Sequence, residues 1–212
     1  TPRTSSAASD VYKRQKISNA FIKEWNIEFI GIPSKKLVPS NNQRFNSYGL
    51  TGCVNIYNTE FNNTNLKVSN GMCEDSLNLI NSIGNIKQIE IKNSFQDALD
   101  IDFSKLTIDK AKIYKSGNDC LDVSGGNYKL INAELIKCED NGVSIGEKST
   151  FIIDNVFIQN SNSGITVKDL SQLYLKKAKI DSSKLCISVY QKKQEFGGCL
   201  LYTSPSPRDA TL

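Results

Sequence analysis

The chain has 212 residues and no histidine. That absence excludes a histidine general base, histidine metal ligands, and the Ser-His and Cys-His pairs that activate nucleophiles. Long apolar runs are also missing, since no stretch approaches the roughly 20 residues of a membrane-spanning helix. Any catalytic or binding chemistry in this sequence must therefore use other side chains, such as carboxylates, amides, hydroxyls or amines.

Cysteine is scarce, and its spacing does not suggest pairs. There are six cysteines, of which Cys199 lies in a C-terminal tail considered below. The other five are Cys53, Cys73, Cys120, Cys138 and Cys186. An odd number without short paired spacings argues against a disulfide framework and against a zinc site. We therefore expect neither.

The two ends of the chain differ from the rest. Residues 5–15 read SSAASDVYKRQ, and residues 199–209 read CLLYTSPSPRD. Both resemble translations of the two adapters used in transposon-based sequencing libraries, in the orientations expected at opposite ends. We therefore interpret residues 1–15 and 199–212 as non-native tails, and residues 16–198 as the natural domain. The ends of that domain would then be cuts, and a signal sequence could have been lost with the missing N-terminus.

Charge of one sign is not in excess once these tails are set aside. The whole chain carries 26 basic and 22 acidic side chains, a net charge of +4. The tails contribute four basic and two acidic residues, so the remainder carries a net charge of +2. Both signs are interspersed along this remainder, which leaves no electrostatic footprint for nucleic acid. We expect no nucleic-acid partner.

What the sequence does have is an internal repeat of 22 residues. Six short segments share one pattern, and each starts 22 residues after the one before: 76–80, 98–102, 120–124, 142–146, 164–168 and 186–190. Their second position is always aliphatic: Leu77, Leu99, Leu121, Val143, Ile165 and Ile187. The fourth position is aliphatic as well, from Leu79 to Val189. This alternation is the period of a β-strand that buries one face.

A second strand recurs in each unit. One copy contains Leu106, Ile108, Ala111 and Ile113, and the same spacing returns in the next three units. Units this short have no room for a βαβ crossover, and none can bury its apolar side without stacking on a neighbour. We therefore predict an all-β fold, a right-handed single-stranded parallel β-helix (a solenoid) with about six coils of ~22 residues. Residues 16 to about 50 would form an irregular first coil.

Polar side chains follow the same repeat. A polar pair precedes the inward strand of successive units: Glu74-Asp75, Gln96-Asp97, Asn118-Asp119, Asp140-Asn141 and Asn162-Ser163. One interpretation is a structural turn ladder, in which these side chains bond the backbone of the neighbouring coil. The outward positions of the strand form two further columns, which we expect to be exposed. The first column holds Asp100, Asp122, Ser144, Thr166 and Ser188, and the second holds Asp102, Ser124, Gly146, Lys168 and Tyr190.

The two outward columns bring three carboxylates together. Asp100 and Asp122 should lie about 5 Å apart, with Asp102 nearby. Stacked like charges repel and raise a pKa unless a cation or hydrogen bond intervenes, so this cluster points to a site. Asp100, Asp102 and Asp122 would bind Ca²⁺ through oxygen ligands, or carboxylates of the cluster would supply acid and base for glycoside chemistry. The alternative is an exposed acidic face that Lys168 and its neighbours neutralise.

Three segments resemble polygalacturonase-type β-helix glycosidases: DALDID at 97–102, NDCLDV at 118–123 and NGVSIG at 141–146. The resemblance covers roughly residues 96–168. It implies catalytic roles for Asp97, which matches the aspartate of the family's NTD element, and for Asp119, which matches the second aspartate of its DDC element. Lys168 matches the lysine of the family's RIK element.

This sequence also departs from that family at three positions. The first aspartate of the DDC element is Asn118 here, the family's histidine is Asn141, and its arginine is Thr166. An asparagine cannot donate a proton as a general acid. These replacements argue against a polygalacturonase mechanism.

A broader resemblance covers about residues 50–198. These coils are similar to bacterial right-handed β-helix repeat proteins of the pectin-lyase-like superfamily, a resemblance that implies the fold and little about the reaction. Two functions therefore stay open. One is a carbohydrate-binding or spacer module of a larger bacterial surface or secreted protein, placed outside the cell. The other is a polysaccharide lyase, epimerase or glycoside hydrolase that uses Asp97, Asp100, Asp119 and Asp122 with Lys168, with or without Ca²⁺.

Overall fold

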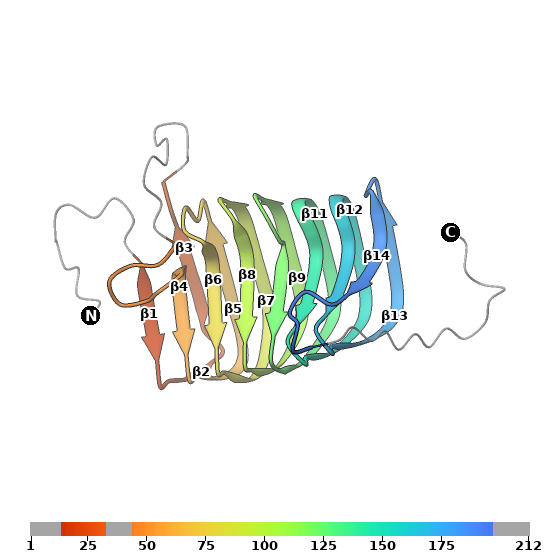
Figure 1. Cartoon of the computed structure of the whole chain (residues 1–212). Helices are drawn as coiled ribbons and strands as arrows, with labels where there is room; N and C mark the ends of the chain where they lie inside the picture. Colours follow the sequence, from red (N-terminus) through yellow and green to blue (C-terminus); the bar gives the residue numbers. More distant parts are fainter. Residues whose placement is uncertain (1–13, 33–43, 197–212) are drawn as a thin grey trace.

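The computed structural model describes residues 14–32 and 44–196, and these form an all-β parallel solenoid of about six turns (Figure 1). No helix occurs among the described residues, and every strand pairing there is parallel. The predicted fold class and the 22-residue repeat are thus confirmed. No helix in this part of the chain could cross a membrane.

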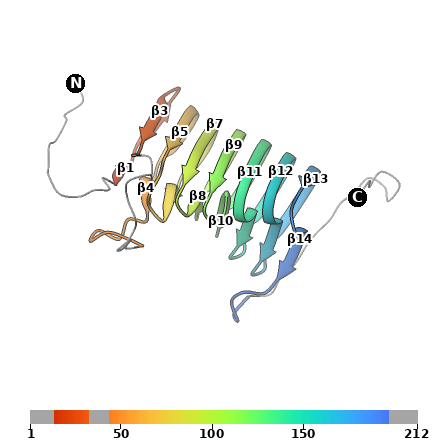
Figure 2. The same ribbon diagram turned by 90° about the horizontal axis from the view of Figure 1, so that it is seen from above.

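The strands stack in two rows that face each other across the core (Figures 1 and 2). The first row is β1 (Gln15–Ser18), β4 (Gly52–Tyr57), β6 (Asp75–Ile80), β8 (Asp97–Asp102), β10 (Leu121–Ser124), the ends of β11 (Asn127–Gly146) and β12 (Thr150–Lys168), and β14 (Leu185–Tyr190). The second row is β2 (Phe21–Lys23), β3 (Asn26–Ile30), β5 (Glu60–Ser69), β7 (Ile83–Ser94), β9 (Lys105–Ser116), the first parts of β11 and β12, and β13 (Gln172–Asp181). We call their outward surfaces the first face and the second face.

The register of the first row is the one that the repeat predicts. Leu99 pairs with Leu77 and Leu121, and the ladder continues through Val143 and Ile165 to Ile187. The members from Leu99 to Ile165 are fully buried in one continuous apolar core. Burial of an aliphatic side chain of this size contributes roughly 1.5–3 kcal/mol, so the ladder fixes which side of each strand faces inward.

Asparagine stabilises the corners between the two rows. Asn81 and Asn93 adopt φ angles of 49° and 58°, a left-handed conformation that asparagine tolerates better than most residues. Their side chains also bond along the axis, because Asn81 Nδ2 donates to Asn58 Oδ1 at 2.8 Å and Asn93 Nδ2 donates to Asn70 Oδ1 at 3.1 Å. The corner residues therefore add a hydrogen-bonded ladder outside the core.

The expectation that the cysteines would not pair is wrong. Disulfides join Cys53 to Cys73 and Cys120 to Cys138, with Cα–Cα distances of 5.4 and 5.3 Å. Their sequence separations of 20 and 18 are slightly less than one coil, so each bond closes a coil across one corner. The two cysteines of each pair are distant in the sequence but close in space, because the chain between them almost completes one turn of the solenoid. Cys186 is a free, exposed thiol.

The first coil is more regular than the sequence predicts. Strands β1, β2 and β3 pair in parallel with β4 and β5, so residues 15–30 already form part of a turn. Except for Arg14 and Gln15, the predicted non-native tails lie outside the described residues, as do residues 33–43.

Candidate functional site

The polar residues of the first face form the two columns that the repeat predicts. Asp122 pairs with Asp100 on one side and Ser144 on the other, and Thr166 and Ser188 continue the column. The structure extends this column toward the N-terminus through Asn78 and Asn55. The second column contains Tyr57, Ile80, Asp102, Ser124, Gly146, Lys168 and Tyr190.

The prediction that these columns are fully exposed is wrong. Ser144 and Thr166 are completely buried, Lys168 is 7% exposed, and Asp100 and Asp122 are half-buried. One reason is contact within the column, where Thr166 Oγ1 lies 2.8 Å from Ser188 Oγ. The other reason is cover from the two ends of the solenoid.

Two segments stand out on the side of the first face, before β4 and after β14 (Figure 2). The segment after β14 is held by Asp169, whose Oδ1 accepts hydrogen bonds from Lys192 N and Lys193 N at 2.8 and 2.9 Å. Lys193 also forms an ion pair with Glu147. The segment before β4 contacts the columns through Thr51 Oγ1, which accepts from Asn78 Nδ2 at 2.8 Å.

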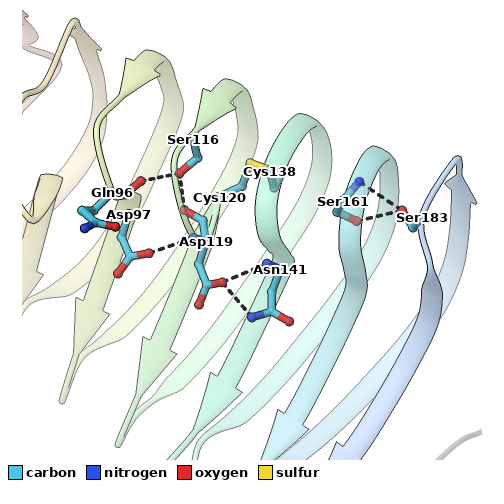
Figure 3. Close-up of a disulfide and its surroundings, with 9 residues drawn as sticks. All are labelled: Gln96, Asp97, Ser116, Asp119, Cys120, Cys138, Asn141, Ser161 and Ser183. Atoms are coloured by element: carbon cyan, nitrogen blue, oxygen red, sulfur yellow. Dashed lines mark hydrogen bonds between the residues drawn. A yellow bond between two sulfur atoms is a disulfide. The ribbon is translucent and has the colours of Figure 1, made fainter.

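Asp97 and Asp119 belong to the turn ladder and not to the outward columns (Figure 3). Asp97 Oδ1 accepts from Asp119 N and from Asn118 Nδ2, both at 2.8 Å. One coil further, Asp119 Oδ1 accepts from Asn141 N at 2.9 Å and from Asn141 Nδ2 at 2.7 Å. Each carboxylate thus satisfies a backbone N–H of the next coil, as the structural interpretation of these polar pairs requires.

The ladder and the first column are connected. Thr166 Oγ1 donates to Asn141 Oδ1 at 2.6 Å, so a hydrogen-bonded chain runs from Asp97 through Asp119 and Asn141 to the column. The disulfide between Cys120 and Cys138 lies beside this chain (Figure 3). The positions that the family resemblance singles out are therefore adjacent to the outward carboxylates, although Asp97 and Asp119 have structural hydrogen bonds of their own.

The carboxyl groups of the ladder have raised pKa values. Burial raises the pKa of Asp97 to about 8, and the negative charge of Asp119 adds to the effect. Burial also raises the pKa of Asp119 to about 6, followed by the charge of Asp122, while hydrogen bonds from Asn141 and the charge of Lys168 act in the opposite direction. Removal from water thus outweighs the hydrogen bonds that favour the ionised form.

The outward carboxyl groups are shifted in the same direction. Burial raises the pKa of Asp100 well above its usual value, and the charges of Asp75, Asp102 and Asp122 contribute further. The pKa of Asp102 rises to about 6, first by burial and then by the charge of Asp122. Both carboxyl groups therefore keep a proton to a higher pH than an aspartate side chain in water does.

Several polar atoms on this face lack a partner. Among the described residues, Asn78 Oδ1, Asp122 Oδ1 and Ser144 Oγ are buried and have no hydrogen bond of good geometry, although the Ser144 hydroxyl lies close enough to Asp122 to lower the pKa of that carboxyl group. Asn78 is 2% exposed, and its Nδ2 already donates toward Thr51, Asp75 and Asp100. A buried acceptor without a donor destabilises the fold by about 1–3 kcal/mol, so these atoms require an explanation.

The Lys168 side chain extends past Gly146 along the second column. A Cβ at Gly146 would lie 3.7 Å from Lys168 Cε and 3.9 Å from Ser124 Oγ, so the lysine stem passes close to this position along the second column. Burial is the largest influence on the pKa of Asp122 and raises it, and the charge of Lys168 is the largest opposing influence. Lys168 therefore affects Asp122 through its charge, and its side chain is buried and not exposed.

The sequence interpretation missed two members of this site. Asn78 lies one coil before Asp100, at the same repeat position, just as Asp75 of the first polar pair lies one coil before Asp97. Tyr57 lies in the second column, and burial followed by the charges of Asp75 and Asp102 raises its pKa. Extending the two columns by one coil toward the N-terminus would have found Asn78, and by two coils Tyr57, because all of them obey the same period.

The predicted calcium site has no geometric support among the described side chains. No group of three or more Asp, Glu, His or Cys residues in this part of the chain converges in a way that could hold a metal ion. Asp100, Asp102 and Asp122 are close in register but lie side by side and do not surround a common point. The first face has many side-chain oxygen atoms, but they are spread along the columns and do not converge as the ligands of a calcium ion do.

Comparisons with known proteins do not extend this description. The chain matches no family model, no curated protein and no solved structure. The assignment to the parallel β-solenoids therefore rests on its own repeat, register and strand pairing.

Proposed function

We propose that this chain is a β-helix module of the pectin-lyase-like type, from a secreted or cell-surface bacterial protein, that binds carbohydrate along the first face. The observation that carries this proposal is the group of half-buried carboxyl side chains Asp100, Asp102 and Asp122, which lie in register on this face and form no ion pair with another described residue. Sugar hydroxyl groups donate hydrogen bonds to such carboxylates, and hydrogen bonds to an ionised group are roughly twice as strong as neutral ones.

Two aromatic side chains support the same proposal. Tyr57 and Tyr190 lie toward opposite ends of the second column; Tyr57 is half-buried with Lys16 Nζ 5.4 Å from its ring centroid, and Tyr190 is 46% exposed. Aromatic side chains with a polar end are favoured at binding surfaces because they combine apolar contact area with a hydrogen-bonding group. A sugar chain lying along the solenoid axis would meet carboxylates in the middle and a tyrosine ring near each end.

The disulfides support the cellular location in the proposal. Structural disulfides persist in oxidising compartments and are rare where glutathione keeps thiols reduced. Outside the C-terminal tail, Cys53 pairs with Cys73 and Cys120 pairs with Cys138, about three coils apart at the same edge of the solenoid, and Cys186 is left over. This pattern fits a protein that folds after export.

A glycan array probed with the full chain, followed by titration of the best ligand, tests the proposal. The Asp100→Ala/Asp122→Ala variant should lower the affinity at least about tenfold, since charge-assisted hydrogen bonds are roughly twice as strong as neutral ones. The matched control is Glu60→Gln/Glu139→Gln, two exposed acids away from this face, and it should bind normally. Equal losses in both variants, or no binding to any glycan, would overturn the proposal.

A second candidate function is polysaccharide cleavage or epimerisation on the same face. The observation in its favour is the separation of pKa values, about 8 for Asp97 and about 6 for Asp102 and Asp119, with the pKa of Asp100 shifted in the same direction. Carboxyl groups with different protonation states are what acid and base catalysis requires. Lys168 would supply the positive charge near a substrate carboxylate, as the resemblance to glycosidases implies.

Activity assays separate the two candidates. Release of reducing ends or of unsaturated products should be abolished by Asp100→Asn while binding persists, because the amide keeps the shape and loses the transferable proton. A binding module shows no turnover in the wild-type chain with any glycan that it binds.

A further inference from the structure

The second face carries a groove of about 430 Å³ that the carbohydrate proposal does not use. Its two sides are columns of outward residues from β9, β11, β12 and β13. One side is Lys110, Asn132, Asn155 and Lys177, and the other is Lys112, Glu134, Phe157 and Lys179. A second hollow of about 350 Å³ adjoins it toward β7 and shares Lys110, Lys112 and Glu134.

Apolar residues form the floor of the groove. Ala111, Ala133 and Val156 lie there at consecutive positions of one inward-turned column. Ala111 is fully buried and Ala133 is 9% exposed, so the groove has an apolar base between two polar sides.

The charge of the groove is strongly positive. Four lysines line it against a single glutamate, and Lys112 pairs with that glutamate at 3.4 Å. Lys179 lies over the Phe157 ring, 5.4 Å from its centroid. Lys110 and Lys177 form no ion pair or hydrogen bond within residues 14–32 and 44–196, so their charges remain available to a ligand.

The lysines are spaced along the axis and not gathered at one point. Lys110 and Lys177 lie three coils apart in the same column, as do Lys112 and Lys179 in the other. At about 4.8 Å per coil, the two ends are separated by roughly 14 Å. That distance exceeds the Debye length of about 8 Å at physiological ionic strength, so one small anion cannot be held by both ends.

We propose that this groove binds a linear acidic polysaccharide along the solenoid axis. The separated lysine pairs would contact negative groups on successive parts of the chain, and the Asn132 and Asn155 side chains between them would bond sugar hydroxyls or ring oxygens. Carboxylate or sulfate groups complement the unpaired lysines, and the apolar floor accommodates the C–H faces of the sugar rings.

A polysaccharide fits the groove better than a single-stranded nucleic acid. Nucleic-acid grooves of this type stack successive bases on aromatic side chains, whereas Phe157 is the one aromatic residue lining the larger hollow and Lys179 already covers its ring. The disulfides also favour a ligand met outside the cell.

The test is calorimetric titration of the full chain with oligomannuronate, which has a carboxylate on every sugar, and with the same oligomer after methyl esterification. The wild type should bind the acid form and not the ester, and added salt should weaken the binding. The variant Lys110→Gln/Lys177→Gln should reduce the affinity about tenfold or more. The control Lys105→Gln/Lys184→Gln removes two exposed lysines away from the groove, with the same change in net charge, and should behave as the wild type.

Three results would overturn the proposal: equal binding of acid and ester, equal losses in the groove and control variants, or binding of a single-stranded oligonucleotide that is equally strong and equally sensitive to Lys110→Gln/Lys177→Gln. Absence of binding to oligomannuronate and to a sulfated glucan would overturn it as well. The Asp100→Ala/Asp122→Ala variant should retain binding in this groove. Failure of the first-face proposal is therefore distinguishable from failure of this one.

Discussion

The two faces of the solenoid handle charge in opposite ways. On the second face, acids and bases alternate or pair: Lys67 contacts Glu28 at 2.8 Å, Lys92 contacts Glu90 at 2.6 Å, and Lys176 contacts Asp154 at 2.6 Å. The hydrogen bond from Lys92 lowers the pKa of Glu90, and that from Lys176 lowers the pKa of Asp154. On the first face, carboxylates stack on carboxylates, and their pKa values rise.

This difference shows that the first face keeps an electrostatic repulsion that the fold itself does not require. A parallel solenoid places equivalent positions of successive coils about 4.8 Å apart, so a repeated acid always meets another acid. The second face avoids that repulsion in the column Glu28, Lys67, Glu90, Lys112 and Glu134, where the sign of the charge changes from coil to coil. The first face does not avoid it, and perturbed carboxyl groups of this kind are concentrated at functional sites.

The largest expected difference between the faces is in the pH dependence of stability. Folded pKa values of about 8 for Asp97 and about 6 for Asp102 and Asp119 lie above the unfolded value near 3.9. The folded state then binds more protons, so stability is fully present below about pH 4 and is lost as pH rises through 6 to 8. We expect a loss of the order of several kcal/mol.

Chemical denaturation between pH 4 and pH 8 measures this effect. The variant Asp97→Asn should flatten the upper part of the curve, because it removes a carboxyl group with a pKa of about 8. A stability that is constant or that increases over this range would contradict the raised pKa values.

The disulfide beside the first-face ladder should have the next largest effect. Replacing both Cys120 and Cys138 with serine opens a loop with a sequence separation of 18, which should lower the free energy of unfolding by about 3 kcal/mol. Hydrogen exchange should accelerate at the backbone amides of Asp119 and Asn141 before it changes at the second-face strand β9. Uniform acceleration over both faces would show that the bond does not act locally.

Neutralising the acidic column should stabilise the protein. At pH 8, Asp100→Asn/Asp122→Asn should raise the free energy of unfolding by about 1–3 kcal/mol, because it removes buried like charges and keeps the side-chain shape. The measurement is urea denaturation of both proteins in the same buffer. A destabilised variant would mean that an unseen partner, such as a cation, compensates these charges in the wild type.

The matching change on the second face should have the opposite sign and the smallest size. Glu90→Gln/Glu134→Gln breaks the contacts with Lys92 and Lys112, which are solvent-exposed pairs, and should lower stability by about 0.5 kcal/mol. The same urea experiment at low and high salt checks it, since screening should erase the difference. A stabilising result would remove the contrast between the faces.

The sequence predicts the fold and the register well because both follow from local periodicities. The two-residue alternation of apolar side chains places Leu99 and Leu121 inward, and the 22-residue repeat stacks them on each other. The pairing of Asp100 with Asp122 follows without further information. The turn-ladder interpretation of Asp97 and Asp119 is confirmed for the same reason.

Burial and disulfide pairing could not be predicted in the same way. The covering of Lys168 and Thr166 depends partly on where the segment after β14 folds back, and that segment lies outside the repeat. The cysteine pairs depend on the position of the corners within a coil. With the register known, the pattern is visible: Cys53, Cys120 and Cys186 fall in one column at intervals of about three coils.

The same two disulfides have a mechanical consequence. A solenoid pulled by its ends lengthens by unwinding one coil after another, and each freed residue can extend by up to about 3.5 Å. The chain between bonded cysteines, with separations of 20 and 18 residues, cannot be extended in this way. Each bond therefore withholds roughly 60–70 Å of length. Under tension, a turn closed by a disulfide therefore adds almost no length when it unwinds, and its length is released only when the bond is reduced.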